Sequence, residues 1–121
     1  APLVGIGTFL LVRGRSEARQ HERATIQRRM IGRIEAAGEI SIADLALESG
    51  LTRDQVRENL VDLVSMGLFS GYVDWERGRL YARQAAELRD MQNCQNCGSP
   101  LQLAGHGLVR CPYCGAEYFL P

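Results

Sequence analysis

Four cysteines in the last quarter of this 121-residue chain are its clearest chemical signal. They form two pairs, Cys94 with Cys97 and Cys111 with Cys114, and each pair encloses two residues. Two cysteines at this spacing can place both sulfurs on one ion from a single tight turn, so two such turns supply four thiolates for a tetrahedral metal. We expect one structural Zn²⁺ on these four side chains. Iron, or free or oxidised thiols, are the alternatives.

The residues around the pairs support a closed metal site. Gly98 and Gly115 follow the second cysteine of each pair and permit the backbone conformation that closes such a turn. Four ligands complete the coordination sphere, so the metal is expected to hold the fold and not to activate water. His106 lies between two glycines and is interpreted as an exposed residue at a hairpin tip. The segment 93–121 resembles a zinc ribbon through its paired Cys-x-x-Cys-Gly turns.

The distribution of the cysteines and the lack of catalytic motifs favour a metal-binding protein without enzymatic activity. Confinement of all four to one segment favours a local metal site in a reducing cytosol over a disulfide framework spread through a secreted fold. The sequence shows no motif that pairs a nucleophile with a base and no glycine-rich phosphate loop. We therefore expect a protein without enzymatic activity.

Helices are expected before the cysteines. A polar helix from Ser16 to Thr25, with Ser16 as its cap, should be followed by an amphipathic helix that begins at Ile26 and ends at Gly38. The next two helices carry cap signals, because Asp44 follows Ser41 by three residues and Gln55 follows Thr52 by the same distance. Their expected ends are Gly50 and Gly67.

After these helices the pattern predicts a hairpin. Residues 68–75 and 80–81 read as two short strands around a turn that contains Gly78. A helix-turn-helix followed by such a hairpin, the wing, is typical of the winged-helix fold. Residues 83–92 are polar and are expected to form a short helix or a linker.

The stretch from Thr25 to Ala82 resembles the winged helix of PCI domains. The matching positions are Gly67, Gly71, Val73, Asp74 and Gly78. This resemblance implies a module used for protein contacts in multisubunit assemblies.

Charge argues against DNA as the partner of this module. From residue 41 to residue 81 there are four arginines and seven acids, a net charge of −3. Because phosphate neutralisation by basic side chains supplies most non-specific affinity for DNA, an acidic recognition helix is poorly suited to that role. A protein partner is therefore favoured over nucleic acid. The side chains interpreted as candidate partner contacts are Arg53, Arg57, Tyr72, Trp75 and Arg77.

The N-terminal part suggests a membrane. Ten uncharged residues, 3–12, are followed by an arginine-rich segment, although a spanning helix needs about 20 apolar residues. We expect the end of a membrane anchor that residues before Ala1 would complete, with a helix docking on a partner or a local core element as alternatives. The anchor side chains are Leu3, Val4, Ile6, Phe9, Leu10, Leu11 and Val12.

Together these patterns predict an α+β protein. Its expected parts are the end of an anchor (1–12), a basic juxtamembrane helix (13–24), a winged helix (25–82), a linker (83–92) and a four-cysteine zinc ribbon (93–121). The expected function is a protein-interaction module on the cytoplasmic face of a membrane, as an accessory subunit of a membrane assembly. The alternative is a transcription regulator that binds DNA or RNA polymerase, because this order of domains is similar to that of archaeal transcription factor E.

Overall fold

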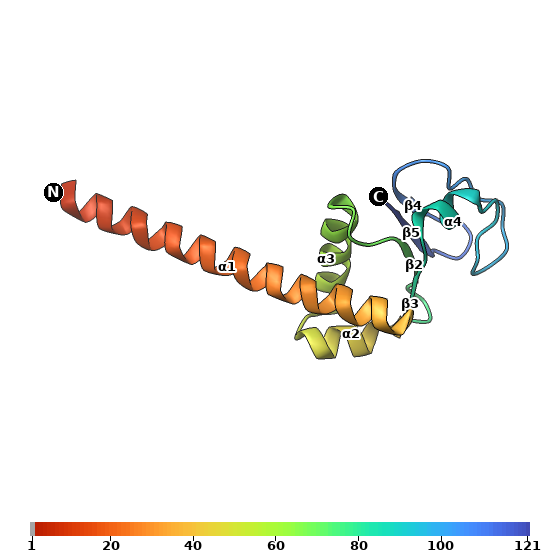
Figure 1. Ribbon diagram of the computed structural model, residues 1–121, viewed down its shortest axis with the longest axis horizontal. Helices are drawn as coiled ribbons and strands as arrows, with labels where there is room; N and C mark the ends of the chain where they lie inside the picture. Colours follow the sequence, from red (N-terminus) through yellow and green to blue (C-terminus); the bar gives the residue numbers. More distant parts are fainter. Residues whose placement is uncertain (1) are drawn as a thin grey trace.

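The computed structural model describes residues 2–121, with the side chains of residues 19–121. It is a mixed helix and sheet fold in which a long N-terminal helix leads into a folded body (Figure 1). The body consists of the elements from β1 to β5 and the end of the long helix that packs on them. The helices are α1 (Pro2–Ala37), α2 (Ile42–Ser49), α3 (Arg53–Ser65) and α4 (Ala85–Asp90). The strands are β1 (Glu39–Ser41), β2 (Gly71–Asp74), β3 (Arg79–Ala82), β4 (Gly107–Arg110) and β5 (Glu117–Leu120).

Helix α1 is continuous, whereas two separate helices were expected from Ser16 onward. Ser16 lies inside α1 and is not its cap. The residues around it are mostly Arg, Glu, Ala and Gln, which favour helix, so nothing in this stretch interrupts the backbone. The backbone of the first half of α1 extends away from the body, and the described side chains from Arg23 onward contact other elements (Figure 1). Within residues 2–121, no helix has an apolar stretch of the length needed to cross a membrane.

The expected N-terminal caps of α2 and α3 are present, whereas the C-cap of α3 is Met66, one residue before the expected Gly67. Ser41 accepts a hydrogen bond from the backbone N–H of Asp44, and α2 ends at Gly50. At the start of α3, Thr52 and Gln55 form both bonds of a capping box. These local signals therefore set both helix starts.

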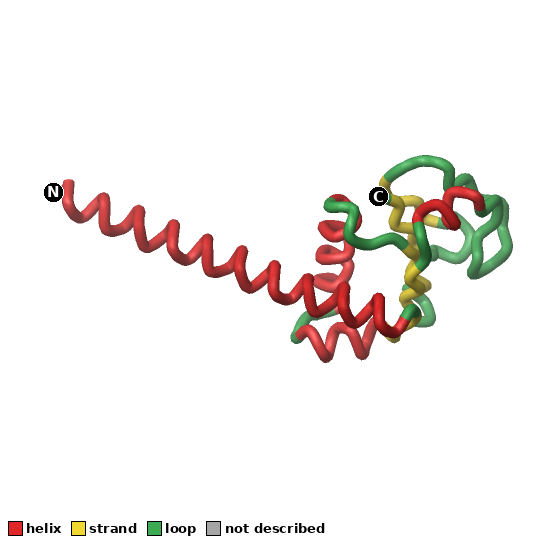
Figure 2. Tube along the Cα trace, in the orientation of Figure 1, coloured by secondary structure: helices red, strands yellow, loops and turns green. Residues whose placement is uncertain are grey.

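All five strands belong to one antiparallel sheet with the order β1-β3-β2-β5-β4. Figure 2 shows the strands in yellow. The expected hairpin is present as β2 and β3, with Tyr72 opposite Tyr81. Strand β1 was not expected from the sequence, because three residues are too few to show an alternating pattern. Strand β5, which follows the last cysteine, pairs with β2, so the cysteine-bearing segment and the hairpin share one sheet.

Two apolar cores lie in contact with this sheet. The first, the helical core, includes Met30, Ile34, Leu45, Leu60, Val73 and Phe119. The second, the cysteine core, includes Leu88, Leu103, Tyr118, Leu120 and two of the cysteines. Strand β5 contributes to both, because successive side chains of a strand point to opposite faces. Phe119 enters the helical core, where its ring lies 5.6 Å from that of Phe69, while Tyr118 and Leu120 enter the cysteine core.

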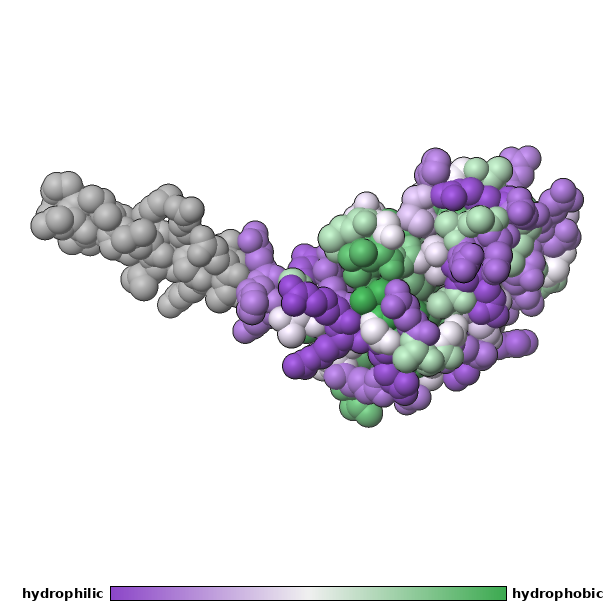
Figure 3. Space-filling view, viewed as in Figure 1, coloured by the Kyte–Doolittle hydropathy of each residue, from purple (hydrophilic) through white to green (hydrophobic). Residues whose placement is uncertain are grey.

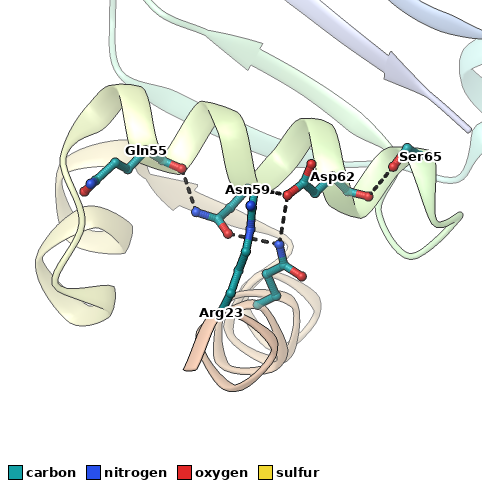
Figure 4. A network of polar contacts seen from close by, with 6 residues as sticks. Arg23, Gln55, Asn59, Asp62 and Ser65 are labelled. Atoms are coloured by element: carbon teal, nitrogen blue, oxygen red, sulfur yellow. Dashed lines mark hydrogen bonds and ion pairs between the residues drawn. The ribbon is translucent and has the colours of Figure 1, made fainter. Parts of the chain in front are cut away.

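A polar network connects α1 to α3 (Figure 4). The buried amide of Gln27 donates to Asn59 Oδ1 at 3.0 Å and approaches Asp62 Oδ2 at 3.3 Å. Asn59 donates in turn to the backbone oxygen of Gln55 at 2.8 Å, and Arg23 forms an ion pair with Asp62. These contacts fix which turns of α1 and α3 face each other.

Candidate metal centre

The four cysteines meet at one point, as the sequence predicts. Their sulfur atoms all lie within 4.8 Å of one another, and none is in a disulfide. Cys94 Sγ is 3.6 Å from Cys114 Sγ, and Cys97 Sγ is 3.6 Å from Cys111 Sγ. Four thiolates bound at about 2.3 Å around a tetrahedral ion would be roughly 3.8 Å apart. The four side chains therefore fit a single metal ion.

The two turns that carry the cysteines have the same hydrogen-bond pattern. In the first, Gly98 N donates to Cys94 O at 2.8 Å and Cys94 N donates to Ser99 O at 2.7 Å. In the second, Gly115 and Ala116 repeat these two bonds with Cys111 at 3.0 and 2.8 Å. Gly98 and Gly115 have φ angles of +78° and +77°, a left-handed conformation that glycine adopts without strain. The repeated pattern explains how two short segments present four sulfurs symmetrically.

Two hydroxyl groups lie next to the sulfurs. Tyr118 on β5 donates to Cys94 Sγ at 3.5 Å and accepts from the backbone N–H of Gln95 at 2.7 Å. Ser99 Oγ lies 3.2 Å from Cys97 Sγ. Such neighbours orient metal ligands and stabilise their charge. Bonds from the Ser99 side chain and backbone lower the pKa of the Cys97 thiol to about 6, which favours the thiolate form that binds metal.

The other sulfurs have more sheltered surroundings. Burial raises the pKa of the Cys114 thiol to about 11, so a bound cation is needed to keep this ligand deprotonated at neutral pH. Burial also acts on Cys94, but hydrogen bonds from Tyr118 and from the backbone outweigh it and lower the pKa of that thiol. A cation bound among the four sulfurs would stabilise all four as thiolates, so the site suits a cation.

His106 takes no part in the cluster of sulfurs. It is exposed, as the sequence suggests, and its Nδ1 lies 2.8 Å from the backbone oxygen of Pro121. The candidate metal site therefore consists of the four cysteines, whose four sulfurs would fill a tetrahedral coordination sphere.

Three of the candidate partner contacts are used inside the molecule. Arg57 on α3 binds Glu117 on β5 through two bonds of 3.0 and 2.8 Å, and this carboxylate raises the pKa of the guanidinium. Trp75 donates from its indole N–H to the same carboxylate at 3.2 Å. Arg53 donates to the backbone oxygen of Trp75 and lies 5.4 Å from the centre of its ring. We name these four residues the Glu117 cluster. They attach α3 to the strand that follows the metal turns.

Tyr72, the fourth candidate contact, is buried. It retains only 7 % of its accessible surface and is stacked between Tyr81 at 4.8 Å and Tyr118 at 5.1 Å. The sequence did not reveal this burial, because it arises from the pairing of β2 with β5. Arg77 differs, since its side chain is mostly exposed beside Asp74. The seven anchor side chains, from Leu3 to Val12, lie outside the residues whose side chains the structure describes.

Glu117, Tyr118 and Ser99 were not expected to be site residues. In the sequence, Glu117 is a lone acid and Tyr118 is part of an apolar strand. Only the register of β5 against β2 brings them to Arg57 and Cys94, and no local signal encodes that register. Comparison of the chain with protein-family models, with curated proteins and with solved structures finds no match.

Proposed function

We propose that this protein is a non-enzymatic interaction module in which a winged helix and a zinc ribbon form one folded body. The order helix, strand, helix, helix, strand, strand from α1 to β3 supports a winged helix, as does the adjacent placement of β1, β3 and β2. The PCI-like assignment of this unit rests on the sequence resemblance.

Zinc is the metal that we propose for the cysteine site. Four thiolates in two tight turns are the ligand set typical of structural zinc, and no coordination position is left for a reacting water. Purified protein should contain about one zinc per chain by elemental analysis. Iron in place of zinc, or protein folded without any metal, would contradict the assignment.

The charges on the surface of α3 are the observation that favours a protein partner over DNA. In a winged helix that reads DNA, the second helix of the helix-turn-helix presents its side chains to the groove. All four of Arg53, Arg57, Asp54 and Glu58 are exposed on this helix, but the two arginines are engaged in the Glu117 cluster. Negative charge on this surface repels phosphate and suits a protein.

The N-terminal part of α1 is proposed to attach this module to the cytoplasmic face of a membrane. The sequence supports this through ten uncharged residues that precede an arginine-rich segment. Full-length protein should float with vesicles that contain anionic lipid, and removal of residues 1–12 should abolish flotation. Equal flotation of both forms would refute the role of this segment.

One experiment compares the two kinds of partner. Tagged full-length protein, extracted from membranes in mild detergent, should elute as a complex larger than the chain alone and retain stoichiometric protein partners. A labelled DNA duplex at low salt should show no shift. Salt-sensitive duplex binding that falls on changing Arg53 or Arg57 would instead support the transcription regulator, and a lone chain without partners would refute the interaction module.

A further inference from the structure

An apolar groove lies between the end of α1 and the segment that connects α3 to β2. Its volume is about 430 Å³, within the range of sites that take up apolar groups. Ile34, Phe69 and Ala82 are among the side chains that line it, and Ile31 and Leu68 stand beside them. Leu68, which lines the groove, remains 54 % exposed, so its apolar side chain is accessible to a partner. Figure 3 shows hydrophobic surface gathered beside α3 and the end of α1.

We infer that this groove is the docking surface for the protein partner. Its occupant is an amphipathic helix of that partner, which places apolar side chains in the groove. The inference rests on the proposed interaction function and gives it a location. It moves the partner surface away from the Glu117 cluster, because Trp75 follows β2 whereas Phe69 and Ser70 precede that strand.

The backbone beside the groove favours insertion of side chains over addition of a strand. Arg83 N donates to Ser70 O at 3.2 Å, and Ser70 Oγ donates to Arg83 O at 2.6 Å. Ala82 N donates to Gly38 O at 2.9 Å. An extended peptide needs unpaired backbone groups, and these are already paired. A helix instead binds through apolar side chains one turn apart.

Two opposite charges border the groove and define the chemistry of the helix. Glu35 comes from α1 and Arg83 from the segment after β3, and both are exposed. Neither forms an ion pair with any residue whose side chain the structure describes. The bound helix therefore carries a cation toward Glu35 and an anion toward Arg83, with apolar residues between them. Such a pattern fixes the direction of binding.

The position of the groove along α1 disfavours lipid as its occupant. From residue 12 to residue 31, a continuous helix rises about 30 Å at 1.5 Å per residue. If residues 3–12 lie at a bilayer, a partner protein can reach the groove more readily than lipid can.

Photo-crosslinking in cells tests the proposal with the full chain. A benzophenone amino acid replaces Leu68 at the groove or, as a control, Leu47 on α2, which is 83 % exposed. The Leu68 position should give one discrete adduct with a protein, and mass spectrometry should place the crosslink in a helix with the stated apolar and charged pattern. The Leu47 position should not give that adduct.

Charge reversal provides the second readout. Glu35→Arg should reduce the adduct about tenfold by placing like charges together, whereas Glu76→Arg on the exposed hairpin turn should leave it unchanged. Both sites are exposed, and unchanged circular dichroism and metal content would verify folding. An adduct with a second copy of the chain or with lipid, an equal adduct from Leu47, or indifference to Glu35→Arg would each overturn the proposal.

The elution of the detergent extract distinguishes failure of the docking groove from failure of the interaction function. If a large complex is present but Leu68 gives no adduct, the groove is not its docking surface and the interaction function stands. If the chain elutes alone, both are refuted.

Discussion

The body of the protein is joined to its two ends in different ways. The C-terminal segment is attached by backbone pairing of β5 with β2, by the buried ring of Phe119 and by the Glu117 cluster. Helix α1 is attached by apolar side chains from Ile26 to Ile34 and by the polar network around Asn59, which includes Arg23. The C-terminal segment is therefore part of the cooperative fold, whereas the attachment of α1 weakens from residue 37 toward residue 19.

Removal of the proposed metal should cause the largest loss of stability, because it acts on the attachment of the C-terminal segment. Chelation would release the turns that position β5, and structural zinc contributes on the order of 10 kcal/mol in small zinc domains. We expect the helical core to lose stability as well, since Phe119 belongs to it. Trp75 fluorescence and thermal unfolding followed by circular dichroism would report this, because Trp75 bonds to Glu117. Zinc addition should reverse the change, and unaltered helix melting would contradict it.

Phe119→Ala should destabilise the body by about 3–5 kcal/mol, the usual range for a buried aromatic side chain. Phe119 has no exposed surface and contacts Phe69 across the helical core. Leu108→Ala on the adjacent strand is the matched control, because Leu108 is partly exposed and should cost far less. Urea unfolding measures both. Similar losses for the two variants would show that β5 does not support the helical core.

Glu117→Gln keeps the shape of a buried side chain but removes its charge. We expect a loss of about 1–2 kcal/mol, reduced from the value for a fully buried pair because the Arg57 side chain is 44 % exposed. Glu39→Gln, which weakens the exposed pair with Arg79, should have no measurable effect on urea unfolding. If both variants behave alike, the Glu117 cluster is only a surface contact.

Changes in the polar network should have the smallest effects. Asn59→Ala should cost about 1 kcal/mol, because it leaves the buried Gln27 amide with fewer partners. Arg23→Ala should cost less than about 0.5 kcal/mol, since that ion pair is exposed. Hydrogen exchange should show faster opening of α1 before residue 27 in both variants, with the cysteine turns unaffected. Equal protection along all of α1 would contradict the weakening inferred here.

Local signals in the sequence predicted the starts of α2 and α3 and the clustering of the four cysteines. Thr52 with Gln55 forms a capping box within one turn, and each cysteine pair needs only its own tight turn. Pairing between distant strands has no such signal. The burial of Tyr72 and the bond of Trp75 to Glu117 could not be read from the sequence for this reason, because both depend on β5, more than 40 residues later.

In the middle of α1, by contrast, a local signal gave a wrong prediction. Continuity through Ser16 follows from helix propensity, but a strong cap residue in the sequence suggested a boundary there. A cap acts only where the preceding residues leave the helical conformation, and the sequence before Ser16 does not force them to do so.

The division of β5 between two cores limits how the chain can vary in length. Two residues, Gly115 and Ala116, separate the last cysteine from this strand. One inserted or deleted residue there would exchange the faces of Tyr118 and Phe119, moving the hydroxyl away from the thiolate and the phenyl ring away from the helices. The exposed loop from 104 to 106 has no such constraint on its length, because its residues alternate between no two cores. Divergent copies of this chain should therefore show length changes in that loop while the count after Cys114 stays constant.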